Sequence, residues 1–231
     1  MRHIDNEIND LKKNLANMSD LVKEMIKSII EQLLTKGDGS ISAISSLERE
    51  VNIQEIVIDD KCLKLIALYQ PVGMDLRFIT SVMKINSDLE RMGDEVVNIS
   101  QAWVDLVEYP ELQSLADLPN LPRMVEIVKK MVEDSIAAFN TSDIDLAESV
   151  LKQDDEVDDL KIAILNSLEE YIKASPVDAV IRVSIDLISM VKSIERLGDH
   201  STNISEDVIF MVQGKDIRHP KAVLKKQKSN K

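Results

Sequence analysis

The chain has 231 residues, of which 44% are hydrophobic and only 3% aromatic, and its formal net charge at pH 7 is -13. A core of Leu, Ile, Val and Met with few turn-forming residues favours packed helices over sheets, and the acidic balance argues against a nucleic-acid binder, whose affinity depends on clustered Lys and Arg. No apolar signal core and no run of about 18 apolar residues is present, which predicts a soluble protein, and the single Cys62 excludes an intrachain disulfide and fits a reducing compartment.

Six helices are predicted by apolar residues spaced three and four apart and by Gly and Pro at the breaks between them. In the first half they cover about residues 5–36, 40–70 and 75–108. In the second half they cover about residues 121–139, 142–174 and 177–213. Ser40 is the expected N-cap of the second helix and Gly214 the C-cap of the last. Three prolines mark residues 110–122 as a linker, and the Lys-rich tail, residues 215–231, is predicted to be disordered.

An internal repeat relates the two halves. Pro71 and Pro176 are 105 residues apart. At the same offset, "ERMGDEVVNIS" at residues 90–100 matches "ERLGDHSTNIS" at residues 195–205 in seven of eleven positions. A match of this length at a fixed offset indicates duplication of a whole structural unit.

A shorter match lies upstream at a slightly different offset. "EREVN" at residues 48–52 pairs with "DDEVD" at residues 154–158, which lies 106 residues later and implies a single insertion. Short turns join antiparallel neighbours in such helical units. We therefore predict an all-α fold of two tandem three-helix bundles related by internal duplication, over residues 1–109 and 123–214.

Each copy of the repeated string carries two acids four residues apart, a spacing that puts them on one face of a helix. The second helix of each half carries a matching pair of oxygen-bearing side chains, so two antiparallel helices would face each other across an oxygen-rich patch. Such carboxylates repel one another unless a cation lies between them, and oxygen ligands without His or Cys at ligand spacing favour Mg, Mn, Ca or iron over structural zinc. The predicted metal ligands are Glu48, Asn52, Glu90, Asp94, Asp154, Asp158, Glu195 and Asp199.

Three other features of the repeated strings need an interpretation. Gly93 and Gly198 each cost about 1 kcal/mol relative to Ala inside a helix, and we interpret them as allowing close approach of a neighbouring backbone or ligand. Arg91 and Arg196 form either exposed ion pairs or a clamp on the metal ligands. His200 has no histidine at the equivalent position of the first half and is interpreted as solvent-exposed.

Two other interpretations of the acidic faces stay open. A metal-free helical adaptor would leave these faces solvated or bound to basic partners, and 41 acidic residues make acidic pairs common in this chain. A carboxylate-bridged oxidoreductase would be expected to carry a Glu-x-x-His pair, which the sequence lacks. No nucleophile with its base, phosphate-binding Gly loop or dinucleotide fingerprint is present, so no enzymatic function is predicted.

Three further strings extend the pattern along the chain: "EREVNIQEIVIDD" at residues 48–60, "YQPVGMDLR" at residues 69–77 and "SPVDAVIR" at residues 175–182. Together with the duplicated ExxxD strings, they resemble the PhoU family of phosphate-uptake regulators, and the resemblance covers almost the whole chain. It implies two three-helix bundles with pseudo-twofold symmetry, with metal ions or multinuclear metal clusters on the ExxxD faces. The cofactors that it implies are iron, manganese or magnesium, with zinc less favoured.

The resemblance also implies residue roles and partners. The first site would use Glu48, Glu90 and Asp94, and the second Asp154, Asp158, Glu195 and Asp199. Asn52 stands where the second half has Asp158, so the first site would have one charge fewer. Members of the family are similar in being cytoplasmic, homodimeric negative regulators that couple the ATPase of the phosphate ABC transporter to a sensor histidine kinase. The Lys-rich tail would then touch a membrane or a partner.

Overall fold

The computed structural model describes residues 3–35, 37, 41–109 and 118–218, and within these ranges it contains seven α-helices and no strand. The first half forms α1 (His3–Thr35), α2 (Ser42–Tyr69) and α3 (Met74–Val107). The second half forms α4 (Leu121–Thr141), α5 (Ile144–Leu151), α6 (Asp154–Ala174) and α7 (Asp178–Gln213). The prediction of an all-α fold is confirmed. None of the described helices combines the length and the apolar character required to cross a bilayer.

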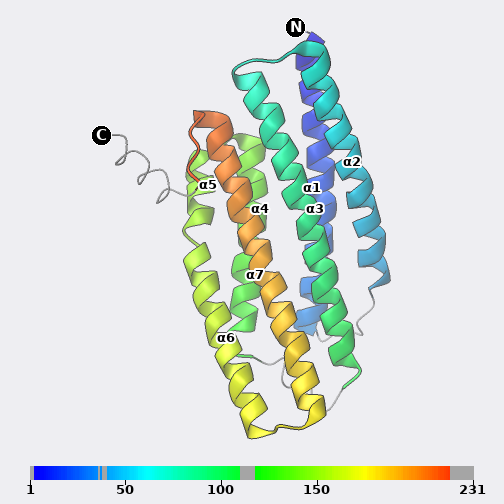
Figure 1. Ribbon diagram of the computed structural model, residues 1–231, viewed down its shortest axis with the longest axis vertical. Helices are drawn as coiled ribbons and strands as arrows, with labels where there is room; N and C mark the ends of the chain where they lie inside the picture. The colour runs from blue at the N-terminus through cyan, green and yellow to red at the C-terminus, as the bar shows by residue number, and fades with distance from the viewer. Residues whose placement is uncertain (1–2, 36, 38–40, 110–117, 219–231) are drawn as a thin grey trace, which may run out of the picture.

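The helices run along the long axis of the molecule in two layers (Figure 1). α3 and α7 lie side by side at the centre of the front layer and run antiparallel, with α2 beyond α3 and α6 beyond α7. The back layer consists of α1, which packs on α2 and α3, and α4, which packs on α5, α6 and α7. α3 and α7 make the most extensive contact of any two helices, so the two halves share one hydrophobic core.

Parts of three predicted segments lie outside the described residues: Ser40, residues 110–117 of the linker and residues 219–231 of the tail. The expectations for the linker, the tail and the limits of the two bundles therefore stay predictions. The C-cap of α7 lies within the described part of the chain. Gly214 adopts a left-handed conformation with φ +69°, and its N–H donates to the Phe210 carbonyl at 2.8 Å, as predicted.

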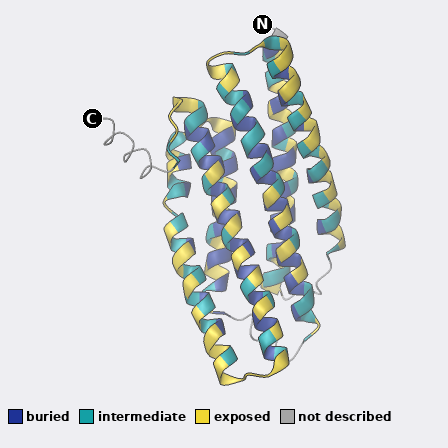
Figure 2. Ribbon diagram, viewed as in Figure 1, coloured by how far each residue is buried: buried dark blue, intermediate teal, exposed yellow. Residues whose placement is uncertain are grey.

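The apolar rows predicted from the sequence form the core. The row of α3 is buried along its whole length: Val82, Ile85, Leu89, Met92, Val96 and Trp103. Equivalent residues of α1 and α4, 106 positions apart, are fully buried as well: Met18 with Met124 and Met25 with Met131. Figure 2 shows the buried residues on the helix sides that face one another between the layers. Burying one such side chain stabilises the fold by about 1.5–3 kcal/mol, so apolar contacts rather than surface ion pairs hold the layers together.

Two residues that occur once in the chain lie in this core. Cys62 is fully buried, and burial raises its pKa to about 12, so the thiol stays protonated at neutral pH. The Trp103 Nε1 donates to the Gly37 carbonyl at 3.2 Å, which satisfies the polar end of a side chain that is otherwise packed in the core. Both side chains are therefore part of the core.

The prediction of a single helix over residues 142–174 is wrong, because the chain breaks between α5 and α6. The Gln153 N–H bonds to the Val150 carbonyl, three residues back, at 3.0 Å. In a continuous helix the Gln153 N–H would donate to the Ser149 carbonyl, four residues back. Here the Gln153 side-chain Nε2 donates to that carbonyl instead, at 3.1 Å. Three consecutive acids, beginning with Asp154, then favour a new helix N-terminus, where backbone N–H groups carry partial positive charge. The break places Asp154 in the first turn of α6, at mid-height of the molecule (Figure 1).

Gly93 and Gly198 pack on core side chains and not on a neighbouring backbone. A Cβ built on Gly198 would lie 3.6 Å from Met131 Cε and 3.8 Å from Val128 Cγ2, both on α4. A Cβ built on Gly93 would lie 3.6 Å from Val51 Cγ1 on α2. These are ordinary van der Waals distances, so the interpretation that the glycines allow close backbone approach is wrong.

Replacement of Gly198 by Ala is expected to stabilise the protein by about 0.5–1 kcal/mol, because Ala is the better helix former and the added methyl group fits the available space. Equilibrium unfolding in urea measures the effect. Gly93→Ala, in the equivalent position of the other half, is the matched variant and is expected to behave alike. Destabilisation by either substitution would contradict the packing described here.

Candidate functional site

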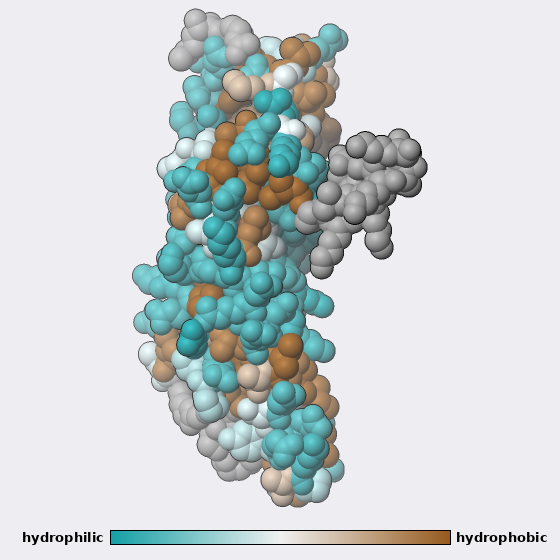
Figure 3. Space-filling model, turned by 90° about the vertical axis from the view of Figure 1, so that its left-hand side faces the viewer, coloured by the Kyte–Doolittle hydropathy of each residue, from teal (hydrophilic) through white to brown (hydrophobic). Residues whose placement is uncertain are grey.

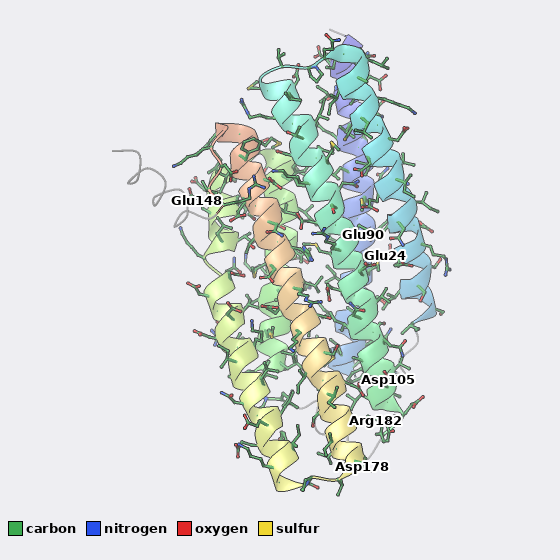
Figure 4. All side chains as sticks on the ribbon, viewed as in Figure 1. Glu24, Glu90, Asp105, Glu148, Asp178 and Arg182 are labelled. Carbon is green, nitrogen blue, oxygen red and sulfur yellow. The ribbon has the colours of Figure 1, made fainter. Side chains whose placement is uncertain are left out.

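Oxygen-bearing side chains of α2 and α3 face one another in the first half. We call this set the first acidic face: Glu48, Asn52 and Glu55 on α2, and Glu90 and Asp94 on α3. Spacings of three and four residues put the side chains of each helix on one side. Figure 4 shows Glu90 near the middle of α3, toward α2. The structure therefore brings the four predicted ligands of the first half together and adds Glu55 to them.

The carboxyl groups of the first acidic face disfavour one another's ionised forms. Burial raises the pKa of Glu90, and repulsion from Asp94 and Glu55 raises it further. Burial also raises the pKa of Asp94, and repulsion from Glu48 adds to the shift. Arg91 opposes these effects by lowering the pKa of Glu90, but its side chain is exposed on α3. A cation bound among these carboxylates would relieve the repulsion.

Asn52 leaves one buried acceptor of the first acidic face without a partner. Its Nδ2 donates to Glu48 Oε1 at 2.6 Å. Its Oδ1 is buried and accepts no hydrogen bond from the described residues. An unsatisfied buried acceptor costs about 1–3 kcal/mol, so this oxygen is available to a ligand. Four carboxylates and one amide oxygen form a donor set that suits Mg²⁺, Mn²⁺ or iron, and the residues of this face fit such an ion.

The second half builds the equivalent surface from α6 and α7. We call this set the second acidic face: Asp154, Asp158 and Lys161 on α6, and Glu195 and Asp199 on α7. Burial raises the pKa of Asp199 to about 6, and repulsion from Glu195 and the α6 acids adds to the shift. Burial also raises the pKa of Asp154, followed by repulsion from Asp158. The side of the molecule that carries α5 and α6 shows a hydrophilic band at mid-height, with apolar areas above and below (Figure 3).

Lys161 places a positive charge within the second acidic face. Its Nζ donates to Asp158 Oδ1 at 2.6 Å and to Glu195 Oε1 at 2.7 Å, and so connects α6 to α7. These hydrogen bonds raise the pKa of Lys161, which therefore carries its charge throughout the neutral range. The side chains of Lys161 and Glu195 are only 22% and 19% exposed, so solvent screens this pair less than a surface ion pair.

Neither acidic face forms a closed ligand shell in this arrangement. Among the residues that the structure describes, no group of three or more Asp, Glu, His or Cys side chains is placed so as to hold a metal ion. The carboxylates of the first acidic face repel one another, and Lys161 already bonds two of the carboxylates of the second. Binding of an ion would therefore require side chains to rotate on helices whose backbones already hold the donors on facing sides.

The sequence prediction omits Glu55 and Lys161. They occupy equivalent positions in the duplication, seven residues after Glu48 and Asp154 respectively. Seven residues are close to two helical turns, so each side chain returns to the side of the helix that carries the predicted ligands. Extending the match between residues 48–52 and their equivalents by three positions would have identified both.

The contact between α3 and α7 uses three side chains of the repeated strings. His200 is not solvent-exposed as predicted: its side chain is 12% exposed, and Nδ1 lies 2.8 Å from Asp88 Oδ1. Asn203 Nδ2 donates to the same oxygen at 3.1 Å. Arg196 forms an ion pair with Glu95, with Nη1 to Oε1 at 3.1 Å, and this pair links the two halves rather than clamping a ligand. These three side chains therefore hold α7 against α3 beside the acidic faces.

Comparison with known proteins finds the same duplicated unit. A family model of the PhoU domain matches residues 15–102 and again residues 121–208. Each match contains all the residues of one acidic face. The prediction of two related helical units is confirmed.

Relatives match over most of the chain. The chain is 34% identical over 213 residues to a phosphate-specific transport system accessory protein PhoU homolog from Pseudomonas aeruginosa, which covers 92% of this chain and 86% of that protein. It is 35% identical over 198 residues to a protein of the same description from Deinococcus radiodurans, covering 86% of this chain and 91% of that one.

Solved structures share the fold. A crystal structure of PhoU from Pseudomonas aeruginosa superposes with a TM-score of 0.81 at 30% identity, over 92% of this chain and 100% of that chain. The phosphate transport system regulatory protein PhoU from Streptococcus pneumoniae superposes with a TM-score of 0.82 at 25% identity, over 92% and 98% of the two chains.

In the presence of a chelator, Asp199→Asn is expected to stabilise the protein above about pH 6 and to change its stability little near pH 4. The pKa of Asp199 is raised from 3.8 to about 6 by folding, so the folded state loses stability as pH rises between these values, and the loss persists above them. Because Asp199 is exposed to solvent, which screens its repulsion from the neighbouring acids, the gain is expected to be modest. Urea unfolding across this pH range measures it, and a difference independent of pH would contradict the assignment.

Proposed function

Because the chain belongs to the PhoU family, we propose that it regulates phosphate transport as an accessory protein of a phosphate-specific transport system. The observation that carries this proposal is the match of both halves to the PhoU domain, together with relatives of that description over nine tenths of the chain. The family consists of accessory regulatory proteins and not of enzymes. The duplicated helical surface, rather than a catalytic pocket, is accordingly the functional part of the molecule.

We further propose that the protein acts in the cytoplasm as a homodimeric negative regulator, and that it couples the ATPase of the phosphate ABC transporter to a sensor histidine kinase. Such an adaptor needs a surface for partners. α2 carries large apolar side chains that are exposed to solvent: Ile53, Ile56 and Leu63, at 60%, 69% and 57%. Exposed apolar side chains on one helix support a role in partner binding, and the net charge of -13 favours partners with basic surfaces.

Metal binding is the second part of the proposal. The first acidic face would hold the ion through Glu48, Glu55, Glu90 and Asp94, with the amide oxygen of Asn52 as a further donor. The second acidic face would use Asp154, Asp158, Glu195 and Asp199. Iron, manganese or magnesium suits these oxygen donors, and zinc is less favoured because no Cys accompanies them. When bound, the ion would supply positive charge that joins the two helices of a face and offers open coordination positions to a partner.

A metal-free adaptor is the alternative, and the second acidic face supports it. Its carboxylates already have a positive partner in Lys161, and neither face has a closed ligand shell among the described residues. In that case the acidic faces would be solvated or would bind basic segments of partner proteins directly. The two alternatives differ in what the purified protein binds.

Expression of this chain in a bacterium that lacks its own PhoU is expected to restore repression of phosphate uptake in high phosphate. Alkaline phosphatase output and the rate of phosphate uptake measure the repression, with the empty vector as control. Unchanged output in cells that contain the folded protein would contradict a role as negative regulator.

Metal binding is expected to depend on Glu90 and Asp94. The double variant Glu90→Gln, Asp94→Asn should weaken Mn²⁺ binding to the first acidic face about tenfold or more, because it replaces two charged donors, and each tenfold step corresponds to about 1.4 kcal/mol. Isothermal titration calorimetry measures the affinity. Glu169→Gln, at an exposed position of α6, is the matched control and should leave binding unchanged. The wild-type chain is purified without chelator and then titrated with Mn²⁺. If it binds fewer than about 0.2 ions per chain, the metal-free adaptor is favoured.

A further inference from the structure

The two acidic faces carry side chains of opposite charge at one equivalent position. At an offset of 106 residues, the duplication pairs Glu48 with Asp154 and Glu55 with Lys161. Each face contains four carboxylates, but the second also contains an ammonium group. Since Glu55 and Lys161 lie on the same side of their helices as the other donors, this difference falls within the site and not on a remote surface.

The contacts of these two residues differ accordingly. Lys161 Nζ lies within hydrogen-bond distance of two carboxylates on different helices, Asp158 on α6 and Glu195 on α7. Glu55 instead lies near Asp94, and in the part of the chain that the structure describes no Lys or Arg forms an ion pair with either carboxylate. The first acidic face therefore has no positive group bonded between its helices, whereas the second has one.

The Lys161 contact is unlike the other lysine pairs of α6. Lys173 pairs with Glu169 at 2.8 Å, but these side chains are 58% and 62% exposed and belong to the same helix. The Lys161 and Glu195 side chains are 22% and 19% exposed and belong to different helices. Water and salt screen the first pair strongly and the second pair weakly, so of the two lysines of α6 only Lys161 compensates charge across two helices.

We propose that Lys161 is a resident cation of the second acidic face, so that the two halves of the protein bind divalent cations unequally. A divalent cation at the first acidic face meets carboxylates without a bonded counter-charge, with Glu55 as an additional donor. At the second acidic face the cation must first displace the Lys161 ammonium from Asp158 and Glu195. The protein then fills its two faces at different cation concentrations. The unequal binding rests on the proposed metal binding, whereas the role of Lys161 as counter-charge does not.

Mn²⁺ titration of the full chain, followed by the electron paramagnetic resonance signal of the free ion, tests the inequality. Wild type is expected to show one class of tight sites and one class whose dissociation constant is at least tenfold larger. A tenfold difference corresponds to about 1.4 kcal/mol. Lys161→Met removes the ammonium and keeps an unbranched helix-forming side chain, so the weak class should tighten at least tenfold. Glu55→Lys should convert the tight class into a weak one. Lys173→Met is the matched control and should change neither class.

Stability in excess chelator tests the counter-charge role separately. Lys161→Met is expected to lower the urea midpoint, because four carboxylates then face one another without compensation, whereas Glu55→Gln should raise it. An unchanged midpoint in Lys161→Met would overturn the counter-charge role. Two equal classes of sites in wild type, or no tightening in Lys161→Met, would overturn the unequal binding. Absence of Mn²⁺ binding in every variant would overturn the unequal binding together with the proposed metal site, while the midpoints still decide the role of Lys161.

Discussion

Repulsion between carboxylates on paired helices is the constraint on which the surface of this protein depends. An apolar core shared by both halves holds α2 against α3 and α6 against α7, and the acids on these helices therefore cannot move apart as whole elements. Besides turning to solvent, the carboxyl groups have three responses: protonation, which the raised pKa values of Glu90, Asp94 and Asp199 favour; an internal cation, which Lys161 provides; or a bound cation. The proposed function uses the third response.

The duplication preserves buried methionines of α1 and the acids of the repeated strings, but it changes a charge on the acidic faces. Met18 and Met25 recur as Met124 and Met131 and are equally buried, because a close-packed interior limits changes in volume. On the faces, Glu55 recurs as Lys161, a reversal of charge that leaves the helices in place. Such a substitution reverses a charge on the surface without changing the fold. Two copies of one helical unit can thus carry different functions on a common scaffold.

The spacing of apolar residues and the positions of Gly and Pro predicted most of the fold, because apolar rows such as that of α3 follow directly from residue spacing. The break between α5 and α6 was not predictable in this way, since it depends on a hydrogen bond from the Gln153 side chain to one carbonyl. The same limit applies to the candidate site. Spacing places Glu90 and Asp94 on one side of a helix, but it does not identify the neighbouring helix, so His200 was assigned to solvent although it contacts Asp88 of α3. Glu55 and Lys161 could have been predicted from the sequence, because the duplication aligns them.

A cation bound between α2 and α3 would relieve the repulsion between their carboxylates. Anomalous X-ray scattering at the manganese edge from crystals grown with Mn²⁺ tests it most directly. An anomalous peak is expected between the two helices, coordinated by Glu90 and Asp94 of α3 and by carboxylates of α2. Crystals that contain Mn²⁺ elsewhere, with the carboxylates of this face turned to solvent and no peak between the helices, would contradict it.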